Sequence, residues 1–403
     1  MHASCASITS TRKSHTRSSH TLVLTTYTFK SRNRSSHAHV LITFKKPRFN
    51  MIKLGIDSFA AVKLDHDAHG TPKKSTPEQR ADAIEKLLER IEYMEEVGLD
   101  VFGLGEHHRP EYLDSSPLTI LAAAAARTSR IQLRSAVTVL SAADPVRVYQ
   151  QLAAIDLISK GRIGLVAGRG SFSEAFPLFG LRFEDYDDLY EEKLKLLLEI
   201  RSKEVITWSG RVRPAMNQQP VYSRSYQSEI SVWVGVGGTP ASFARAGRLG
   251  LPLMIAIIGG EFERFAPLVQ LYYNAGAEAG HPQEKLHVSI HALGFVAEDS
   301  ESAHEQFFPG YAKTFTKIGQ ERGWGGIVTR RNYEMQAVNK RGSIVVGNPA
   351  EVAEKIIAYN TLFGGLAEFR LHMNVAELSH EQLSSAIRLL GEEVAPIVRE
   401  SLA

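Results

Sequence analysis

A carboxylate and two adjacent imidazoles end an apolar stretch in the first third of this chain. Glu106, His107 and His108 follow residues 101–104 (Val-Phe-Gly-Leu) and one glycine. A short apolar run bounded by Gly and then by charge is typical of a buried parallel strand that ends at a polar surface. In repeated β-α folds the carboxyl ends of strands carry the chemistry, so this cluster is the leading candidate for an active site. In the alternative interpretation, one imidazole only hydrogen-bonds within a loop and the other, His108, is solvated.

A glycine-rich turn further along the chain could bind an anion. Residues 235–240 (Gly-Val-Gly-Gly-Thr-Pro) follow an apolar run and precede a predicted helix. Glycines let a ligand approach the backbone, and the amides and dipole at a helix start favour an anion, most naturally a phosphate. We therefore take Gly237, Gly238 and Thr239 as candidate ligand-binding residues. The alternatives are a tight turn without ligand and a Rossmann dinucleotide loop, although Pro240 occupies the third glycine position of that motif.

Arg169 lies between two glycines at the end of another apolar run and is a second candidate for anion binding. A guanidinium there could hold a phosphate or a developing ring anion by charge-assisted hydrogen bonds. The alternative role is a salt bridge to a neighbouring loop acid. Gly170 beside it, and Thr138 and Val139 at the end of the preceding apolar run, would lie at the same edge of a barrel.

The residue types argue against several catalytic classes. A catalytic metal needs three converging ligands, and the side chains of residues 106–108 cannot all face one ion from an extended segment. The His-x-His of barrel hydrolases is absent from residues 52–59, and no Gly-x-Ser-x-Gly elbow occurs. The only cysteine is Cys5, so residues 51–403 contain no disulfide and no thiolate nucleophile. A barrel end that carries an acid and phosphate-binding groups, but no metal site or nucleophile, suits a phosphate-bearing cofactor that supplies the chemistry. We call this end of the barrel its mouth.

Strand and helix patterns alternate from residue 51 to the C-terminus and would position these groups. Predicted strands cover residues 52–59, 101–104, 131–139, 163–167, 232–236, 253–258, 287–296 and 369–373. Thr-Pro, Ser-Pro and Asp-Pro pairs at positions 76, 116 and 144 predict helix starts between them. Eight such units predict a (β/α)₈ TIM barrel with insertions after strands four and seven, the main rival being an open doubly wound sheet. In the insertions we expect a small hairpin within residues 205–230 and a mobile segment at residues 323–343.

Residues 1–50 differ in composition from this barrel domain at residues 51–403. They hold nine of the 47 Lys and Arg residues and no Asp or Glu. Such a Ser-, Thr-, His- and Arg-rich segment cannot bury enough apolar surface to order itself. We therefore expect either a disordered extension or upstream sequence that is not part of the protein, with organellar import as the weaker alternative.

Composition also bears on partners and location. The remaining 38 basic and 44 acidic side chains give residues 51–403 a net negative charge, which offers no electrostatic footprint for nucleic acid. No run of 18 uncharged apolar residues occurs, which argues against a membrane span. We expect a cytoplasmic protein.

In the order and spacing of these motifs, the chain resembles the bacterial luciferase-like, flavin-dependent monooxygenase superfamily. The resemblance covers nearly all of residues 51–403. It rests on residues 105–108 (Gly-Glu-His-His), 159–163 (Ser-Lys-Gly-Arg-Ile), 167–170 (Ala-Gly-Arg-Gly), 234–240 (Val-Gly-Val-Gly-Gly-Thr-Pro) and 246–252 (Ala-Gly-Arg-Leu-Gly-Leu-Pro).

The resemblance implies an enzyme that uses reduced FMN, supplied by a separate flavin reductase, and dioxygen to oxidise a small organic substrate. His107 matches the catalytic histidine and would move protons, while Glu106 would hold that imidazole or a neighbouring loop. A homodimer is also expected. The resemblance places the phosphate near Arg169, Gly237, Gly238 and Thr239, and the isoalloxazine over the backbone at Thr138 and Val139. Gly170 is a further expected cofactor-binding residue.

This chain also departs from the pattern. The second phosphate-binding arginine of luciferase falls in residues 183–188, which are acidic here, so flavin affinity could be lower or Arg182 could substitute. Met254 could line the substrate side, although a core methionine is the simpler interpretation. Residues 205–230 and 300–345 would shape the pocket. The alternatives that stay open are a deazaflavin-dependent dehydrogenase of the same fold and a flavin-binding protein without turnover.

Overall fold

Eight parallel strands close into a barrel in the computed structural model, which describes residues 8–15, 22–29, 39–42, 51–62, 74–170, 172–323, 326–373 and 377–403. In order around the barrel they are β4 (Lys53–Ser58), β5 (Val101–Leu104), β6 (Gln132–Val139), β7 (Ile163–Gly168), β10 (Ser231–Val236), β11 (Leu253–Ile257), β12 (Val288–Val296) and β14 (Glu368–His372). The pairing of β11 with β12 completes the ring, and every pairing in it is parallel. The predicted (β/α)₈ barrel is confirmed, and the open sheet is wrong.

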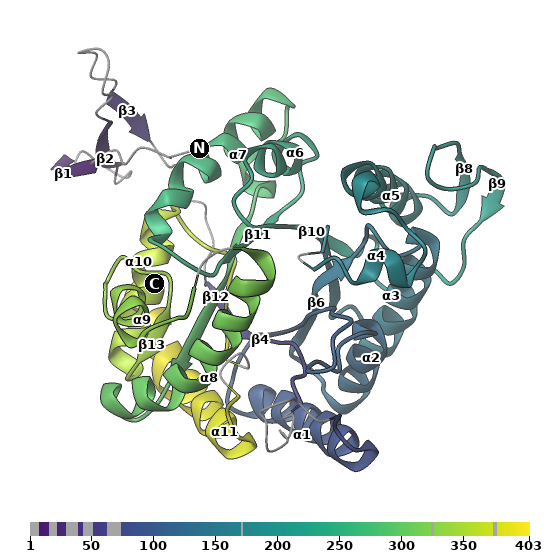
Figure 1. Ribbon diagram of the computed structural model, residues 1–403. Coiled ribbons are helices and arrows are strands. Elements are labelled where there is room, and N and C mark those ends of the chain that lie inside the picture. Colours follow the sequence, from purple (N-terminus) through teal and green to yellow (C-terminus); the bar gives the residue numbers. More distant parts are fainter. Residues whose placement is uncertain are drawn as a thin grey trace.

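Helices cover the outside of the barrel (Figure 1). They are α1 (Pro77–Glu96), α2 (Pro117–Arg127), α3 (Pro145–Ser159), α5 (Tyr186–Ser202), α6 (Pro240–Arg248), α7 (Ala266–Glu278), α8 (Ser300–Arg322), α10 (Pro349–Leu362), α11 (His380–Leu389) and α12 (Ala395–Leu402). Several begin at the predicted signals, because a polar N-cap followed by proline satisfies the first amides of a helix. Thr76 forms a capping box with Gln79, and Asp144 accepts hydrogen bonds from the amides of Val146 and Arg147.

The hydrophobic core lies mainly between the strands and these helices. On α1 it includes Leu87, Leu88, Ile91 and Met94, which lie on one face of the helix. Val166, Trp233 and Met254 form a separate apolar cluster on strands β7, β10 and β11. Val166 pairs in register with Trp233, and successive side chains of a strand alternate between its two faces. This second cluster therefore fills one side of the barrel interior, where Met254 is buried.

Two insertions interrupt the alternation of strands and helices. After β7 come the short helix α4 (Ala175–Leu178), the 3-10 turn η1 (Phe183–Asp185) and, beyond α5, the antiparallel hairpin of β8 (Val205–Trp208) and β9 (Met216–Pro220). This hairpin, which the sequence predicts, projects beside α5 in Figure 1. The second insertion follows β12 and contains α8, α9 (Arg330–Ala337) and β13 (Val345–Gly347), a strand that pairs with β12.

Helix α9 corrects one expectation. Residues 323–343 were predicted to be a mobile insertion because Gly, Arg and Asn dominate them. Within this range, residues 330–337 are helical, Thr329 caps the helix start through the amide of Asn332, and Tyr333 is fully buried. The aromatic side chain anchors the segment against α8, where Tyr333 contacts Phe308 and Tyr311. The predicted mobility is therefore wrong for this helix; residues 324–325 lie outside the described residues.

Ahead of the barrel, the backbone forms strands β1 (Ile8–His15), β2 (Leu22–Phe29) and β3 (His39–Ile42), which pair as an antiparallel sheet in this order. The status of residues 1–50 as a disordered or spurious extension stays a prediction. Within the described residues no helix is long and apolar enough to span a membrane.

Candidate active site at the barrel mouth

All the predicted site residues lie at one end of the barrel. Because every barrel strand is parallel to its neighbours, their carboxyl ends share one rim. Glu106 and His107 follow β5, Thr138 and Val139 end β6, Arg169 and Gly170 follow β7, and Gly237, Gly238 and Thr239 follow β10.

His107 is held by a carboxylate that the sequence analysis missed. The Nδ1 atom of its ring lies 2.8 Å from Oδ2 of Asp114, and its backbone N–H donates to Oδ1 at 3.1 Å. Asp114 is fully buried and His107 is 7% exposed. Burial raises the pKa of Asp114, and the hydrogen bonds and charge of His107 oppose that rise. The pair orients the imidazole so that Nδ1 faces the carboxylate and Nε2 is the ring nitrogen left for other partners.

The glycine before Glu106 makes this pair possible. A Cβ atom on Gly105 would lie 2.8 Å from Oδ2 of Asp114, 3.0 Å from the ring of His107 and 2.6 Å from the ring of Phe59. Those contacts are too close for an L side chain, so only glycine fits. Asp114 itself follows β5 by ten residues, in a stretch whose Ser-Pro pair indicates a helix start; no local signal joined it to His107.

Glu106 binds the neighbouring strand rather than the imidazole of His107. Its Oε2 accepts a hydrogen bond from the backbone N–H of Val139 at 2.8 Å. Its Oε1 lies 3.5 Å from Nε2 of His108, and the pKa of His108 is raised, chiefly by Glu106. The side chain of His108 is only 9% exposed and its ring packs edge-on against Phe179, so it is not solvated. Glu106 thus fixes the end of β6 where a cofactor ring is expected.

Aromatic rings surround His107. The ring centroids of Phe59, Tyr112 and Phe172 lie 4.2, 5.1 and 5.3 Å from that of the imidazole. Phe172 is in turn covered by two guanidinium groups, those of Arg109 and Arg322, at 4.9 and 4.3 Å from its centroid. The cage limits the access of water to His107.

At the other side of the mouth, Arg169 reaches the start of α6. Its Nη2 donates to the hydroxyl of Ser242 at 3.2 Å, and its Nη1 pairs with Asp187 at 2.6 Å. Ser242 lies in the first turn of α6, and within the described residues its N-cap Thr239 makes no side-chain capping bond. Gly238 has a φ of +122°, which L side chains rarely adopt, and among the described residues no atom lies within 4 Å of a Cβ placed on Gly237. The turn is therefore open at Gly237, and Arg169 contacts the first turn of the helix that follows it.

A second guanidinium, that of Arg245, also packs on a tyrosine ring of α5. Arg169 and Arg245 lie over the rings of Tyr186 and Tyr190, which are one turn apart on α5, with 4.9 and 5.7 Å between guanidinium carbon and ring centroid. Nη2 of Arg245 pairs with Glu191, whereas its Nη1 is buried without a hydrogen-bond partner among the described residues. Arg182, which the sequence offered as a substitute, is 74% exposed in its side chain and pairs with two local acids.

One loop joins the two sides of the mouth. The segment after β7 carries Arg169, which contacts α6, and three residues later Phe172, which contacts His107. Between them Gly170 has a φ of +85°. Thr138 on the adjacent strand is buried, and its hydroxyl has no partner among the described residues. The imidazole and the candidate anion site thus belong to one continuous rim.

The barrel interior next to this rim holds an ion network that the sequence analysis did not identify. Asp57 on β4 lies 2.8 Å from Nη1 of Arg370 and 2.6 Å from Nδ1 of His291, and Arg134 lies 3.1 Å from Glu368. These are two carboxylates and two guanidinium groups, each less than a tenth exposed in its side chain. The alternation of Glu368, Arg370 and His372 with apolar residues in one strand was the available signal.

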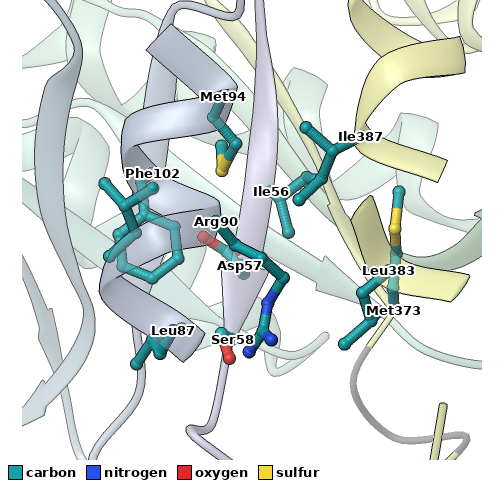
Figure 2. A pocket seen from close by; sticks show the side chains of 11 residues that line it. Ile56, Asp57, Ser58, Leu87, Arg90, Met94, Phe102, Met373, Leu383 and Ile387 are labelled. Carbon is teal, nitrogen blue, oxygen red and sulfur yellow. The ribbon is translucent and has the colours of Figure 1, made fainter. Parts of the chain in front are cut away.

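The pocket shown in Figure 2 is a different feature. It lies between β4, α1 and α11, on the helix side of the barrel wall, and apolar side chains such as Leu87, Met94 and Leu383 line most of it. The guanidinium of Arg90 enters it; burial lowers the pKa of Arg90 to about 10, and its Nη1 lies 3.0 Å from Nδ1 of His380. None of the predicted site residues lines this pocket. Within the described part of the chain, no group of three His, Cys, Asp or Glu residues could hold a metal.

Residues 61–364 match the family model described as luciferase-like monooxygenase. The chain is 25% identical over 345 residues to the alkanal monooxygenase alpha chain of Photobacterium leiognathi, covering 80% of this chain and 96% of that one. It is 24% identical over 332 residues to the limonene 1,2-monooxygenase of Rhodococcus erythropolis, covering 79% and 84%.

Solved structures share the fold. Monooxygenase RslO1 from Streptomyces bottropensis superposes with a TM-score of 0.71 at 22% identity, covering 86% of this chain and 99% of that one. The oxygenating constituent of 3,6-diketocamphane monooxygenase from Pseudomonas putida, in complex with FMN, gives 0.66 at 17% identity, covering 86% and 98%. An F420-dependent secondary alcohol dehydrogenase, in complex with an F420–acetone adduct, gives 0.64 at 18% identity, covering 86% and 99%.

Proposed function

The chain belongs to the luciferase-like monooxygenase family and is an oxidoreductase of monooxygenase type, and from this premise we propose that it uses reduced FMN and dioxygen to oxidise a small organic substrate. The observation that carries the proposal is the loop after β7. Through Arg169 it contacts the start of α6, and through Phe172 it contacts His107. The candidate anion site and the imidazole of His107 therefore lie on one rim, which supports the proposal because a phosphate-bearing redox ring would contact both.

The residues present fit the phosphate of FMN. The open turn at Gly237 and Gly238, the uncapped start of α6 and the guanidinium of Arg169 supply amide and charged donors. Nη1 of Arg245, which is buried and has no hydrogen-bond partner in the described part of the chain, would supply a further donor and take the role offered for Arg182. Such charge-assisted bonds are strong and directional. Backbone at Thr138 and Val139, fixed by Glu106, would support the ring.

When bound, reduced FMN would supply the electrons that activate dioxygen. His107 would hold or move a proton at Nε2, since Asp114 accepts the Nδ1 hydrogen bond. Asp114 fixes the tautomer and Phe172 limits the access of water. The substrate, the separate flavin reductase and a homodimer remain parts of this proposal. Exposed Leu157 and Ile158 on α3 support the dimer.

The test is the reaction of bound reduced FMN with dioxygen in a stopped-flow instrument. The protein should alter the time course and spectra of reoxidation relative to free FMN, and His107→Ala should reduce substrate oxidation while FMN binding survives. Reoxidation identical to that of free FMN, with no binding, would reject the proposal.

A deazaflavin-dependent dehydrogenase is the second candidate. The shared fold with the F420-dependent alcohol dehydrogenase favours it, because a deazaflavin phosphate could use the same donors. The two candidates differ in their need for dioxygen: substrate oxidation that proceeds under anaerobic conditions with F420, and not with FMN in air, would select the dehydrogenase. Cofactor binding without any turnover in either assay would indicate a flavin-binding protein.

A further inference from the structure

A second imidazole–carboxylate pair lies in the barrel next to the rim. Nδ1 of His291, on β12, is 2.6 Å from Oδ2 of Asp57, on β4. The rest of this network is closed to solvent: the side chains of Asp57 and Arg370 are 1% and 0% exposed, and His372 is fully buried. The side chain of His291 is 11% exposed. It is the most exposed of these side chains, and ring contacts connect it to the mouth: His291 packs on His372, which packs on Phe59 beside His107.

The network fixes which nitrogen of His291 carries the proton. Burial raises the pKa of Asp57, but the charge of Arg370 and the hydrogen bond from His291 outweigh it and leave that pKa below its usual value. An ionised carboxylate only accepts hydrogen bonds, so the proton of His291 lies on Nδ1. Nε2 then carries a lone pair, and among the described residues it has no hydrogen-bond partner. Burial also holds the pKa of the neighbouring His372 well below its usual value, so this ring adds no positive charge beside His291.

The strand next to His291 carries apolar and small side chains on the same face. Met254, on β11, lies two residues before the partner of His291 and packs with Val166 and Trp233 of β7 and β10. Ala256 is the residue in register with His291 on the adjacent strand, so its methyl group points to the same side. Ala256 is half-buried and carries only a methyl group.

We propose that His291 binds the oxygen of the substrate through Nε2 and so orients the substrate in the mouth. The substrate would carry a hydroxyl or carbonyl oxygen on an apolar body. A hydroxyl donates to the lone pair of Nε2, and a carbonyl accepts from Nε2 when the ring is protonated. Asp57 holds the ring in place. This inference rests on the proposed function, because it assigns the orientation of the substrate in the same mouth.

The test uses histidine-ring NMR of the full chain without flavin, with hexan-1-ol and hexane as probes. Hexan-1-ol should shift the ring signals of His291 and leave those of His304, which is hydrogen-bonded to Tyr333 outside the barrel, unchanged. His291→Asn keeps a donor to Asp57 but lacks the atom at Nε2. This variant should bind hexan-1-ol roughly three- to tenfold more weakly, as expected for one net hydrogen bond. Its affinity for hexane should not fall.

A second variant distinguishes the loss of the Nε2 contact from a change in folding. Ala256→Val enlarges the side chain in register with His291 and leaves the imidazole in place, so it should weaken hexan-1-ol binding while the Asp57–His291 signals persist. Unshifted His291 signals with hexan-1-ol, or equal binding by wild type and His291→Asn, would overturn the inference. FMN binding, measured separately by fluorescence quenching, should be unchanged in both variants; loss of FMN binding in the wild type would instead count against the proposed function.

Discussion

Replacing Asp114 by Asn tests the role of His107 most directly. Asn has nearly the same shape, and its carbonyl can still accept the backbone N–H of His107, which donates to Oδ1 at 3.1 Å. Its amide group, however, would place a donor 2.8 Å from Nδ1, where the carboxylate now accepts. The favoured tautomer would then carry its proton on Nε2, and the ring would lose its free base at the mouth.

The expected losses of rate and of stability follow from the two roles of the Asp114 carboxylate. Positioned proton transfer contributes about 10²–10⁴-fold to a rate, so substrate oxidation in Asp114→Asn should fall within that range. Exchanging a charge-assisted for a neutral hydrogen bond should cost about 1–2 kcal/mol of the free energy of unfolding, far less than a fold needs to fail. FMN affinity should stay constant, because Arg169 and α6 follow strands β7 and β10, whereas Asp114 follows β5.

The assay is stopped-flow reoxidation of bound reduced FMN, combined with substrate turnover at several pH values and with histidine-ring NMR. The NMR spectrum should report the change of tautomer at His107, and the pH profile of turnover should change shape. The matched control is Asp144→Asn, an N-cap of α3 where Asn serves as well as Asp. The double variant Asp114→Asn/His107→Ala should be no slower than His107→Ala alone. Additive losses, or an unchanged tautomer, would refute the reasoning.

Three further predictions concern the anion site, the barrel interior and acid stability. Arg169→Ala should weaken FMN binding by about 10- to 150-fold, the loss of one charge-assisted contact, whereas Arg182→Ala should leave it unchanged in the same titration. Gly103→Ala should lower the denaturation midpoint strongly, because its Cβ would collide with Asp57; a midpoint equal to that of wild type would contradict the packing. Glu95 accepts bonds from three successive amides, with a pKa of about 2 instead of 4.5, so its stabilisation is present above pH 4.5 and is lost as pH falls toward 2. Urea unfolding of wild type and Glu95→Gln should therefore differ at pH 6 and converge as the pH approaches 2; a difference that persists would contradict the assignment.

The proposed homodimer can be tested at the exposed residues of α3. Sedimentation of wild type and of a Leu157→Lys variant should distinguish a dimer from a monomer. Both side chains of the pair Leu157 and Ile158 are about half exposed, so a charge there should not disturb the fold of one chain. A monomeric wild type would remove the dimer from the proposal.

Much of the fold was predictable from the sequence, because strands, caps and turns are encoded by neighbouring residues. The apolar run Val101–Leu104 is β5 with the predicted bounds, and the Thr76 signal begins α1 as expected. The predicted barrel then placed Glu106, His107 and Arg169 at one rim, since parallel strands share the direction of their ends. Where composition alone was used, as for α9, the expectation failed, because one buried aromatic side chain, Tyr333, anchors an otherwise polar helix.

The partners of the site residues were decided only by the tertiary structure. Asp114 reaches His107 through a loop whose sequence indicates a helix start, and Arg245 lies beside Arg169 because both stack on α5. Asp57 and Arg370 are 313 positions apart and meet only when the first and last strands of the barrel pair. Local patterns fix which residues face inward on a strand, but a hydrogen bond between two strands depends on their register, which closure of the barrel sets.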